Sequence, residues 1–165
     1  MPSFRASQAS YDGMMEKART ARELVGSRGF GCLSTQSLRH PGFPFVSIAE
    51  YATTGETGQL VFLLSGLAVH SKNLALDPRA SLIVFAPDAE QDTLGAARVT
   101  LIGEVRPVPE PEKESARDRY LARHPQAEQW AGFGDFAFYR MQVADVYYVG
   151  GFGQMGWVSV GDFVG

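Results

Sequence analysis

The chain has 165 residues, of which 45% are hydrophobic and 20% are charged, values typical of one globular domain with its own core. These proportions argue against a disordered chain. The 15 basic and 18 acidic residues leave a net charge of −3, which gives no general electrostatic reason to expect nucleic acid as a partner.

The first predicted element is a helix from about Tyr11 to Ser27. Apolar residues recur there at spacings of three and four, with charged residues between them. We expect residues 1–10 to be disordered or extended and residues 11–165 to form a single domain. No apolar run approaches the ~20 residues that span a bilayer, and the N-terminus has no secretory h-region. We therefore expect a soluble intracellular protein of the cytoplasm or the plastid stroma, with no membrane partner.

Six later segments, rich in β-branched and aromatic residues, predict strands. They are residues 30–35, 45–53, 59–65, 80–86, 98–108 and 136–149. A short helix is expected over 70–76, ended by Asp77-Pro78, and a charged helix over 109–123. The pattern favours a mainly β fold (β+α), a six-stranded antiparallel barrel with peripheral helices, because closure removes exposed strand edges.

Two of these predicted strands are apolar on both faces. In residues 59–65 and 80–86, one face can fill the barrel, so the other face needs a helix or a partner chain to cover it. We therefore expect a homodimer. The single cysteine, Cys32, lies in the apolar strand 30–35 and excludes an internal disulfide and a multi-cysteine metal site.

A glycine motif lies near the end of the chain. Gly151, Gly153 and Gly156 have the spacing of a dinucleotide-binding fingerprint, which works only between a strand and a helix. Residues 157–160 predict a strand, and we expect no helix after them. The motif is then a tight turn. Either its glycines let the backbone approach a flat ligand that Trp157 covers, or Trp157 is a core residue.

The densest polar stretch follows the third predicted strand. Ser65, His70, Ser71 and Lys72 combine hydroxyls, an imidazole and a cation with the amides of a helix start, which suits a phosphate or a carboxylate. The alternative is a capped helix start with a surface lysine. Arg98, which opens the fifth predicted strand, is either a second cation facing a cleft or a surface residue.

Five segments carry a family resemblance when they are taken together. They are PFVSIAEY, LLSGLAVHSKNLALDPRASLIVF, RVTLIGEV, YLARHPQAEQW and the GGFG turn. Together they resemble the FMN-binding split-barrel (pyridoxamine phosphate oxidase-like) superfamily. Within it they resemble the HugZ-type haem oxygenase branch, with its plant, algal and cyanobacterial relatives. The resemblance covers about residues 24–160 and implies a homodimer of split barrels with two clefts at the interface.

The resemblance also implies a position for the cofactor. In flavin-binding members, the segment corresponding to residues 70–72 holds the FMN phosphate. The flavin edge lies along Ser47, Leu64 and Ser65, and Arg98 faces the ring system. In HugZ-type members haem occupies the same region, and an arginine comparable to Arg98 neighbours the porphyrin.

These implications give three functional hypotheses. The first is oxidative haem degradation with O2 and an external electron donor, in which Arg98 and His70 are catalytic. The second is an FMN-dependent oxidoreductase. The third is a haem- or tetrapyrrole-responsive protein that regulates another enzyme by contact. In each case the predicted cofactor site includes residues 70–72 and Arg98, together with residues near the end of the chain, namely Gly151, Phe152, Gly153 and Trp157.

The axial ligand of a haem iron is left open by the sequence. HugZ-type members place a histidine beyond the GGFG turn, and no histidine follows His124 here. The candidates are His70, a tyrosine such as Tyr147 or Tyr148, or a residue outside this sequence.

Overall fold

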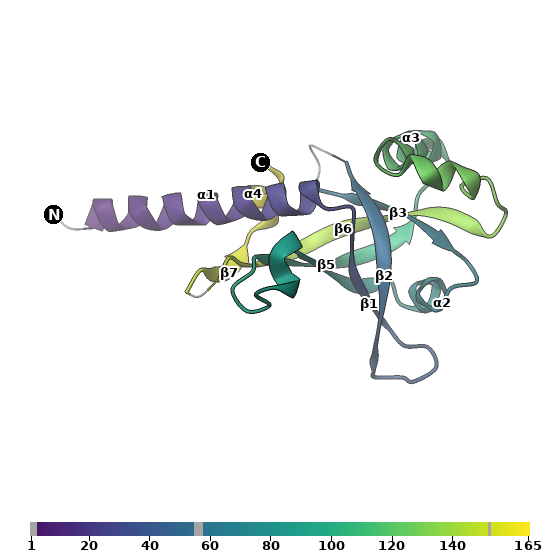
Figure 1. Ribbon diagram of the computed structural model, residues 1–165, viewed down its shortest axis with the longest axis horizontal. Coiled ribbons are helices and arrows are strands. Elements are labelled where there is room, and N and C mark those ends of the chain that lie inside the picture. The colour runs from purple at the N-terminus through teal and green to yellow at the C-terminus, as the bar shows by residue number, and fades with distance from the viewer. Residues whose placement is uncertain (1–2, 55–57, 152) are drawn as a thin grey trace.

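The computed structural model describes residues 3–54, 58–151 and 153–165, with residues 3–11 described by their backbone alone. Seven strands form one antiparallel sheet of order β3-β2-β1-β4-β5-β6-β7. Their bounds are β1 Phe30–Gln36, β2 Pro44–Thr53, β3 Leu60–Ser65, β4 Arg79–Phe85, β5 Arg98–Pro107, β6 Phe136–Val149 and β7 Met155–Val158. A further pairing of β3 with β6 closes the first six strands into a barrel (Figure 1). The predicted mainly β, six-stranded antiparallel barrel is confirmed.

The long strand β6 is what closes the barrel and also extends it. Its first part pairs with β3 from Phe136 to Met141, and its second part pairs with β7 from Val146 to Val149. On its other side it pairs with β5 along most of its length. The strand β7 therefore continues the sheet beyond the closed barrel.

The described residues form four α-helices around the barrel: α1 Ser3–Ser27, α2 Val69–Leu76, α3 Lys113–Arg123 and α4 Val160–Val164. Three 3-10 turns accompany them: η1 Pro87–Glu90, η2 Glu110–Glu112 and η3 Pro125–Gln129. The single helix predicted over 109–123 is thus divided between η2 and α3. Within the described residues, no helix has both the length and the apolar character needed to cross a membrane.

Two predictions about the ends of the chain are wrong. The first helix begins at Ser3 rather than near Tyr11, so residues 3–10 are helical instead of disordered or extended; residues 1–2 lie outside the described residues. No proline follows Pro2 before the end of this helix, so nothing local stops it. At the other end a short helix, α4, does follow β7, capped by the Ser159 hydroxyl, which accepts from the Asp162 amide.

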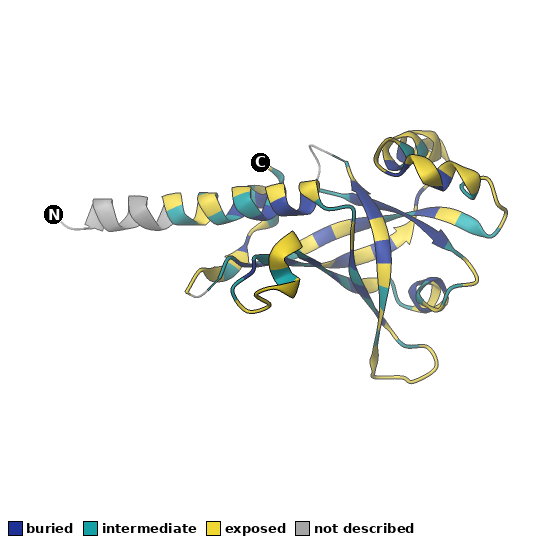
Figure 2. Cartoon of the chain, in the orientation of Figure 1, coloured by how far each residue is buried: buried dark blue, intermediate teal, exposed yellow. Residues whose placement is uncertain are grey.

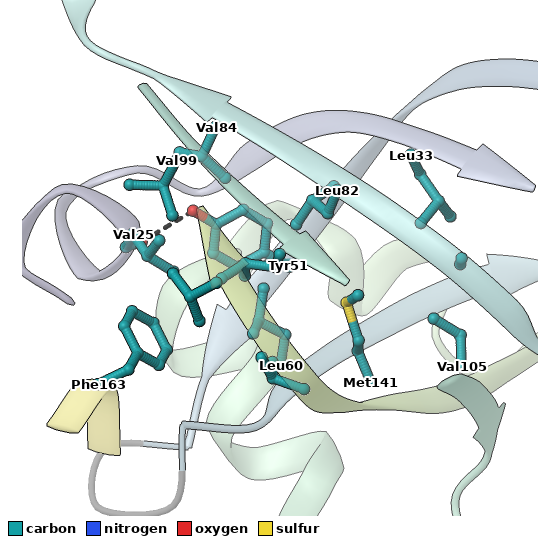
Figure 3. Close-up of a cluster of buried hydrophobic side chains, with 14 of the residues drawn as sticks. Val25, Leu33, Tyr51, Leu60, Leu82, Val84, Val99, Val105, Met141 and Phe163 are labelled. Carbon is teal, nitrogen blue, oxygen red and sulfur yellow. Dashed lines mark hydrogen bonds between the residues drawn. The ribbon is translucent and has the colours of Figure 1, made fainter. Parts of the chain in front are cut away.

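The barrel interior is filled by side chains that alternate inward along the strands. Leu33, Leu82, Leu101 and Met141 have no exposed surface, and α1 closes one end of the barrel with Val25 and its neighbours (Figure 3). Tyr51 crosses this core and donates its hydroxyl proton to the carbonyl oxygen of Val25 at 2.8 Å. The helix α1 is thereby tied to the barrel by a buried hydrogen bond as well as by packing.

The outer face of β3 is covered by a helix, whereas the outer face of β4 is not. Val61 and Leu63 on β3 pack in a second cluster with Ala116 and Tyr120 of α3. On β4 the outward side chains belong to an uncovered face that runs from β2 to β7. Figure 2 shows buried and exposed residues alternating along β2. The exposed apolar residues of this face, which we call the open face, are Phe30, Val46, Ile48, Ile102, Met155 and Trp157.

Candidate functional site

His70 lies in the first turn of α2, directly after the turn that leaves β3. Its Nδ1 is 3.0 Å from the Ser47 hydroxyl of β2, and its Nε2 is buried and has no hydrogen-bond partner among the described residues. Burial lowers the pKa of His70 below its ordinary value of 6.5, so the imidazole is neutral at pH 7. In the tautomer that donates from Nδ1 to Ser47, Nε2 presents a free lone pair.

The helix that carries His70 is fixed to the barrel by a buried asparagine. The Asn73 side chain donates to the Thr35 hydroxyl at 2.9 Å and accepts from the Leu38 amide at 2.9 Å. The helix ends at Asp77, whose extended conformation is the one favoured before a proline. The position of the imidazole is therefore set by β1 and β2, not by α2 alone.

His70 lines a cavity of about 280 Å³ on the outside of the barrel, between α2 and α3. The other lining residues are mostly aliphatic and aromatic: Ile48, Ala49, Glu50, Leu63, Leu64, Ser65, Ala68, Tyr120, Trp130 and Phe136. None of these described lining residues is a lysine or an arginine. Across the cavity, the Tyr120 hydroxyl donates to Glu50 Oε2 at 3.5 Å. We call this cavity the His70 pocket.

The other residues of the predicted anion site are arranged less favourably. The Ser65 hydroxyl donates to Asp135 Oδ2 at 2.8 Å, and the Leu64 side chain is buried in the barrel core. Ser71 is buried, and its hydroxyl has no hydrogen-bond partner in the part of the chain that the structure describes. Lys72 is exposed on α2, does not line the His70 pocket and takes part in none of the ion pairs of the described residues.

Arg98 belongs to a different part of the molecule. Its Nη1 donates to the carbonyl oxygens of Leu94 and Ala96, each at 3.3 Å, and so holds the loop before β5. It lines a second cavity of about 430 Å³. The other lining residues of this cavity are Ile83, Phe85, Ala89, Glu90, Thr93 and Ala96. Within one chain, Arg98 and His70 therefore line separate cavities.

The late glycines form the turn between β6 and β7, as the tight-turn interpretation requires. Gly151 has φ +117° and Gly153 has φ +77°, conformations that side chains disfavour. Trp157 on β7 is exposed and packs edge-on against Tyr147 at 5.0 Å between ring centres, so it is not a core residue. Phe152 lies outside the described residues. Figure 1 places β7 and α2 at opposite ends of the barrel.

The two tyrosines proposed as alternative iron ligands differ in the side of the sheet on which they lie and in their burial. Tyr148 is buried in the barrel core, and burial raises the pKa of its phenol, which opposes the phenolate form that binds iron. Tyr147 lies on the outward side beside Trp157. Burial therefore makes Tyr148 a less favourable ligand, while His70 and Tyr147 stay candidates.

Sequence reasoning missed several residues of the His70 pocket. Glu50, Tyr120, Trp130 and Phe136 come from β2, α3, the end of η3 and the start of β6. For Glu50 there was one local indication in the sequence. It lies two positions after Ile48 and four after Val46, so the alternation along β2 places all three side chains on the same outward face. Nothing in the local sequence indicated that these four side chains meet.

Comparisons with known proteins bear on the family and on the fold. The model of the CREG β-barrel family matches residues 12–164. The non-canonical heme oxygenase HOZ, chloroplastic, of Arabidopsis thaliana is 40% identical over 130 residues, which is 79% of this chain and 39% of that protein. Protein CREG2 of Mus musculus is 28% identical over 163 residues, 89% of this chain and 57% of its own.

A solved structure gives the same picture. The heme binding protein from Mycobacterium smegmatis superposes with a TM-score of 0.82 at 34% identity, covering 90% of this chain and 60% of that one. The chain thus spans less than two thirds of the length of each of these relatives. The split-barrel resemblance expected from the sequence is confirmed.

Proposed function

The chain belongs to the CREG β-barrel family. Because it is also similar to a heme oxygenase of Arabidopsis thaliana and to a heme binding protein of Mycobacterium smegmatis, we propose that it binds haem through His70 and opens it oxidatively, as in HugZ-type haem degradation. The observation that carries this proposal is the state of His70. Its imidazole is neutral, its Nδ1 is held by Ser47, and its Nε2 is buried without a partner. Neutral imidazole is a common axial ligand of haem iron, and a hydrogen bond to its other nitrogen is the usual orienting contact.

The walls of the His70 pocket also suit a porphyrin. The pocket is lined mainly by aliphatic and aromatic side chains, which exclude water and pack against a flat ring system. Its volume, about 280 Å³, lies below the usual range of ligand pockets of ~300–1,000 Å³. The rest of the ligand would lie over exposed apolar residues around it, among them Ile48, Leu67 and Val69.

The proposal includes a homodimer formed through the open face. Ile48 is 70% exposed and Trp157 is 59% exposed, and such residues in one patch favour burial against another chain. A second copy of the chain has the same patch, as a two-fold interface requires. Because Arg98 and His70 line separate cavities within one chain, the proposed dimer would complete the His70 site with Arg98 of the partner subunit.

In this arrangement each residue has a defined role. His70 would bind the iron and Ser47 would orient His70, while Arg98 and Lys72 would hold the propionates outside the His70 pocket. Haem supplies the redox-active iron at which O2 reacts, with electrons from an external donor. The compartment, cytoplasm or plastid stroma, stays a prediction.

The two alternatives have less support from the site. A flavin phosphate needs cations or free donors, but Lys72 lies outside the His70 pocket and the Ser65 hydroxyl is already bound to Asp135. A regulatory protein that binds haem without turnover shares the His70 site, so only an assay of turnover separates it from an enzyme.

The test is a haemin titration of the purified protein, followed by addition of a reductant in air. We expect a saturable Soret band that is lost under turnover, and a weak or shifted band for His70→Ala. Lys113→Ala, on the exposed start of α3, is the matched control and should behave as the parent. A band that is stable under reductant supports the regulatory alternative. No saturable band in the parent, or an unchanged band in His70→Ala, overturns the proposed site.

A further inference from the structure

The His70 pocket carries a negative charge that nothing in its wall balances. Glu50 projects outward from β2 into this pocket, where its carboxylate accepts a hydrogen bond from the Tyr120 hydroxyl. It takes part in none of the ion pairs of the described residues. A second carboxylate, Asp135, accepts a hydrogen bond from the hydroxyl of Ser65, which lines the pocket. An anion entering the pocket would therefore meet like charge.

The hydroxyl groups of the described residues that line the pocket are already committed. The Ser65 hydroxyl donates to Asp135, and the Tyr120 hydroxyl donates to Glu50. The nearby cation, Lys72, is exposed on α2 and does not line the pocket. Binding a phosphate there would cost these hydrogen bonds without gaining an ion pair.

We propose that Glu50 determines ligand selectivity: its carboxylate disfavours a phosphate group inside the His70 pocket and so excludes ligands such as FMN, whereas haem would place its propionates outside the pocket. This inference rests on the proposed function, in which the pocket receives haem. A sphere of about 280 Å³ is about 8 Å across, and over that distance one unit charge changes the affinity for an anion by about 3- to 30-fold.

The test compares two flavins that share a ring system and differ in the phosphate. FMN and riboflavin are titrated into the parent, Glu50→Gln and Glu114→Gln, with quenching of flavin fluorescence as the readout. Glu114 is an exposed glutamate of α3 outside the pocket, so its variant makes the same change in net charge. We expect Glu50→Gln to bind FMN about 3- to 30-fold more tightly than the parent. Riboflavin affinity should stay unchanged, and Glu114→Gln should match the parent for both flavins.

Three outcomes overturn the inference. The first is an unchanged ratio of FMN to riboflavin affinity in Glu50→Gln, including the case in which neither flavin binds. The second is an equal gain for both flavins, which would indicate a change of shape rather than of charge. The third is the same gain in Glu114→Gln. The haemin titration of the same proteins is read separately, so loss of the haem hypothesis and loss of the Glu50 hypothesis are distinguishable.

Discussion

Replacing Ser47 by alanine tests whether the orientation of His70, and not only its presence, supports ligand binding. The substitution removes the 3.0 Å contact to Nδ1 and leaves Nε2 in place. Loss of one such hydrogen bond should lower the free energy of unfolding by about 0.5–1.5 kcal/mol. Loss of an orienting partner typically weakens metal binding by about 10- to 100-fold, which corresponds to about 1.4–2.8 kcal/mol. Haem affinity should therefore fall by more than stability does.

The assay pairs a haemin titration, followed at the Soret band, with urea unfolding of the same protein. Ser115→Ala, on the exposed face of α3, makes the same chemical change away from the His70 pocket and should leave both readouts unchanged. If Ser47→Ala binds haemin as tightly as the parent while His70→Ala does not, the hydrogen bond has no orienting role. If both variants bind normally, iron is not held at this pocket.

Three further predictions follow from the same contacts. Burial lowers the pKa of His70 in the folded state below 6.5, so the unfolded chain binds more protons as the pH falls through that value. The urea midpoint should drop more for the parent than for His70→Gln between about pH 7.5 and 5.5, and equal drops would refute this. Ile48→Lys places a charge on the open face and should give a monomer in sedimentation velocity if the parent is a dimer, whereas a dimeric variant would contradict the assignment of the interface. Asn73→Ala removes the hydrogen bonds to Thr35 and Leu38. It should lower the free energy of unfolding in urea by about 1–3 kcal/mol. A smaller decrease would mean that packing alone holds α2 on the barrel.

The strands were the most predictable part of the fold. The strand predicted over 136–149 has the same bounds as β6, and the predicted break at Asp77-Pro78 is where α2 ends. Alternation of apolar residues and the backbone limits of proline act within a few residues, so both are visible in the sequence. The helix α1 was only partly predicted, because its start has no local signal of its own.

The short C-terminal helix shows a second limit. Val160–Val164 follows β7 and is only five residues long, which is too short to show the helical periodicity of apolar residues. Its position is fixed by contacts from far away: Arg22 of α1 donates to the carbonyl oxygens of Asp162 and Phe163, and Phe163 enters the barrel core. Such a helix depends on tertiary packing more than on its own propensity.

For the site, the sequence by itself determined that His70 lies at a helix start after a buried strand, that Arg98 opens a strand, and that the late glycines form a turn. The tertiary structure alone decided that His70 and Arg98 line different cavities, and that Glu50 and Tyr120 join His70 in one pocket. The reason is physical: backbone conformation follows from neighbours along the chain, whereas the charge and shape of a pocket depend on which distant strands pair and where α3 packs against them.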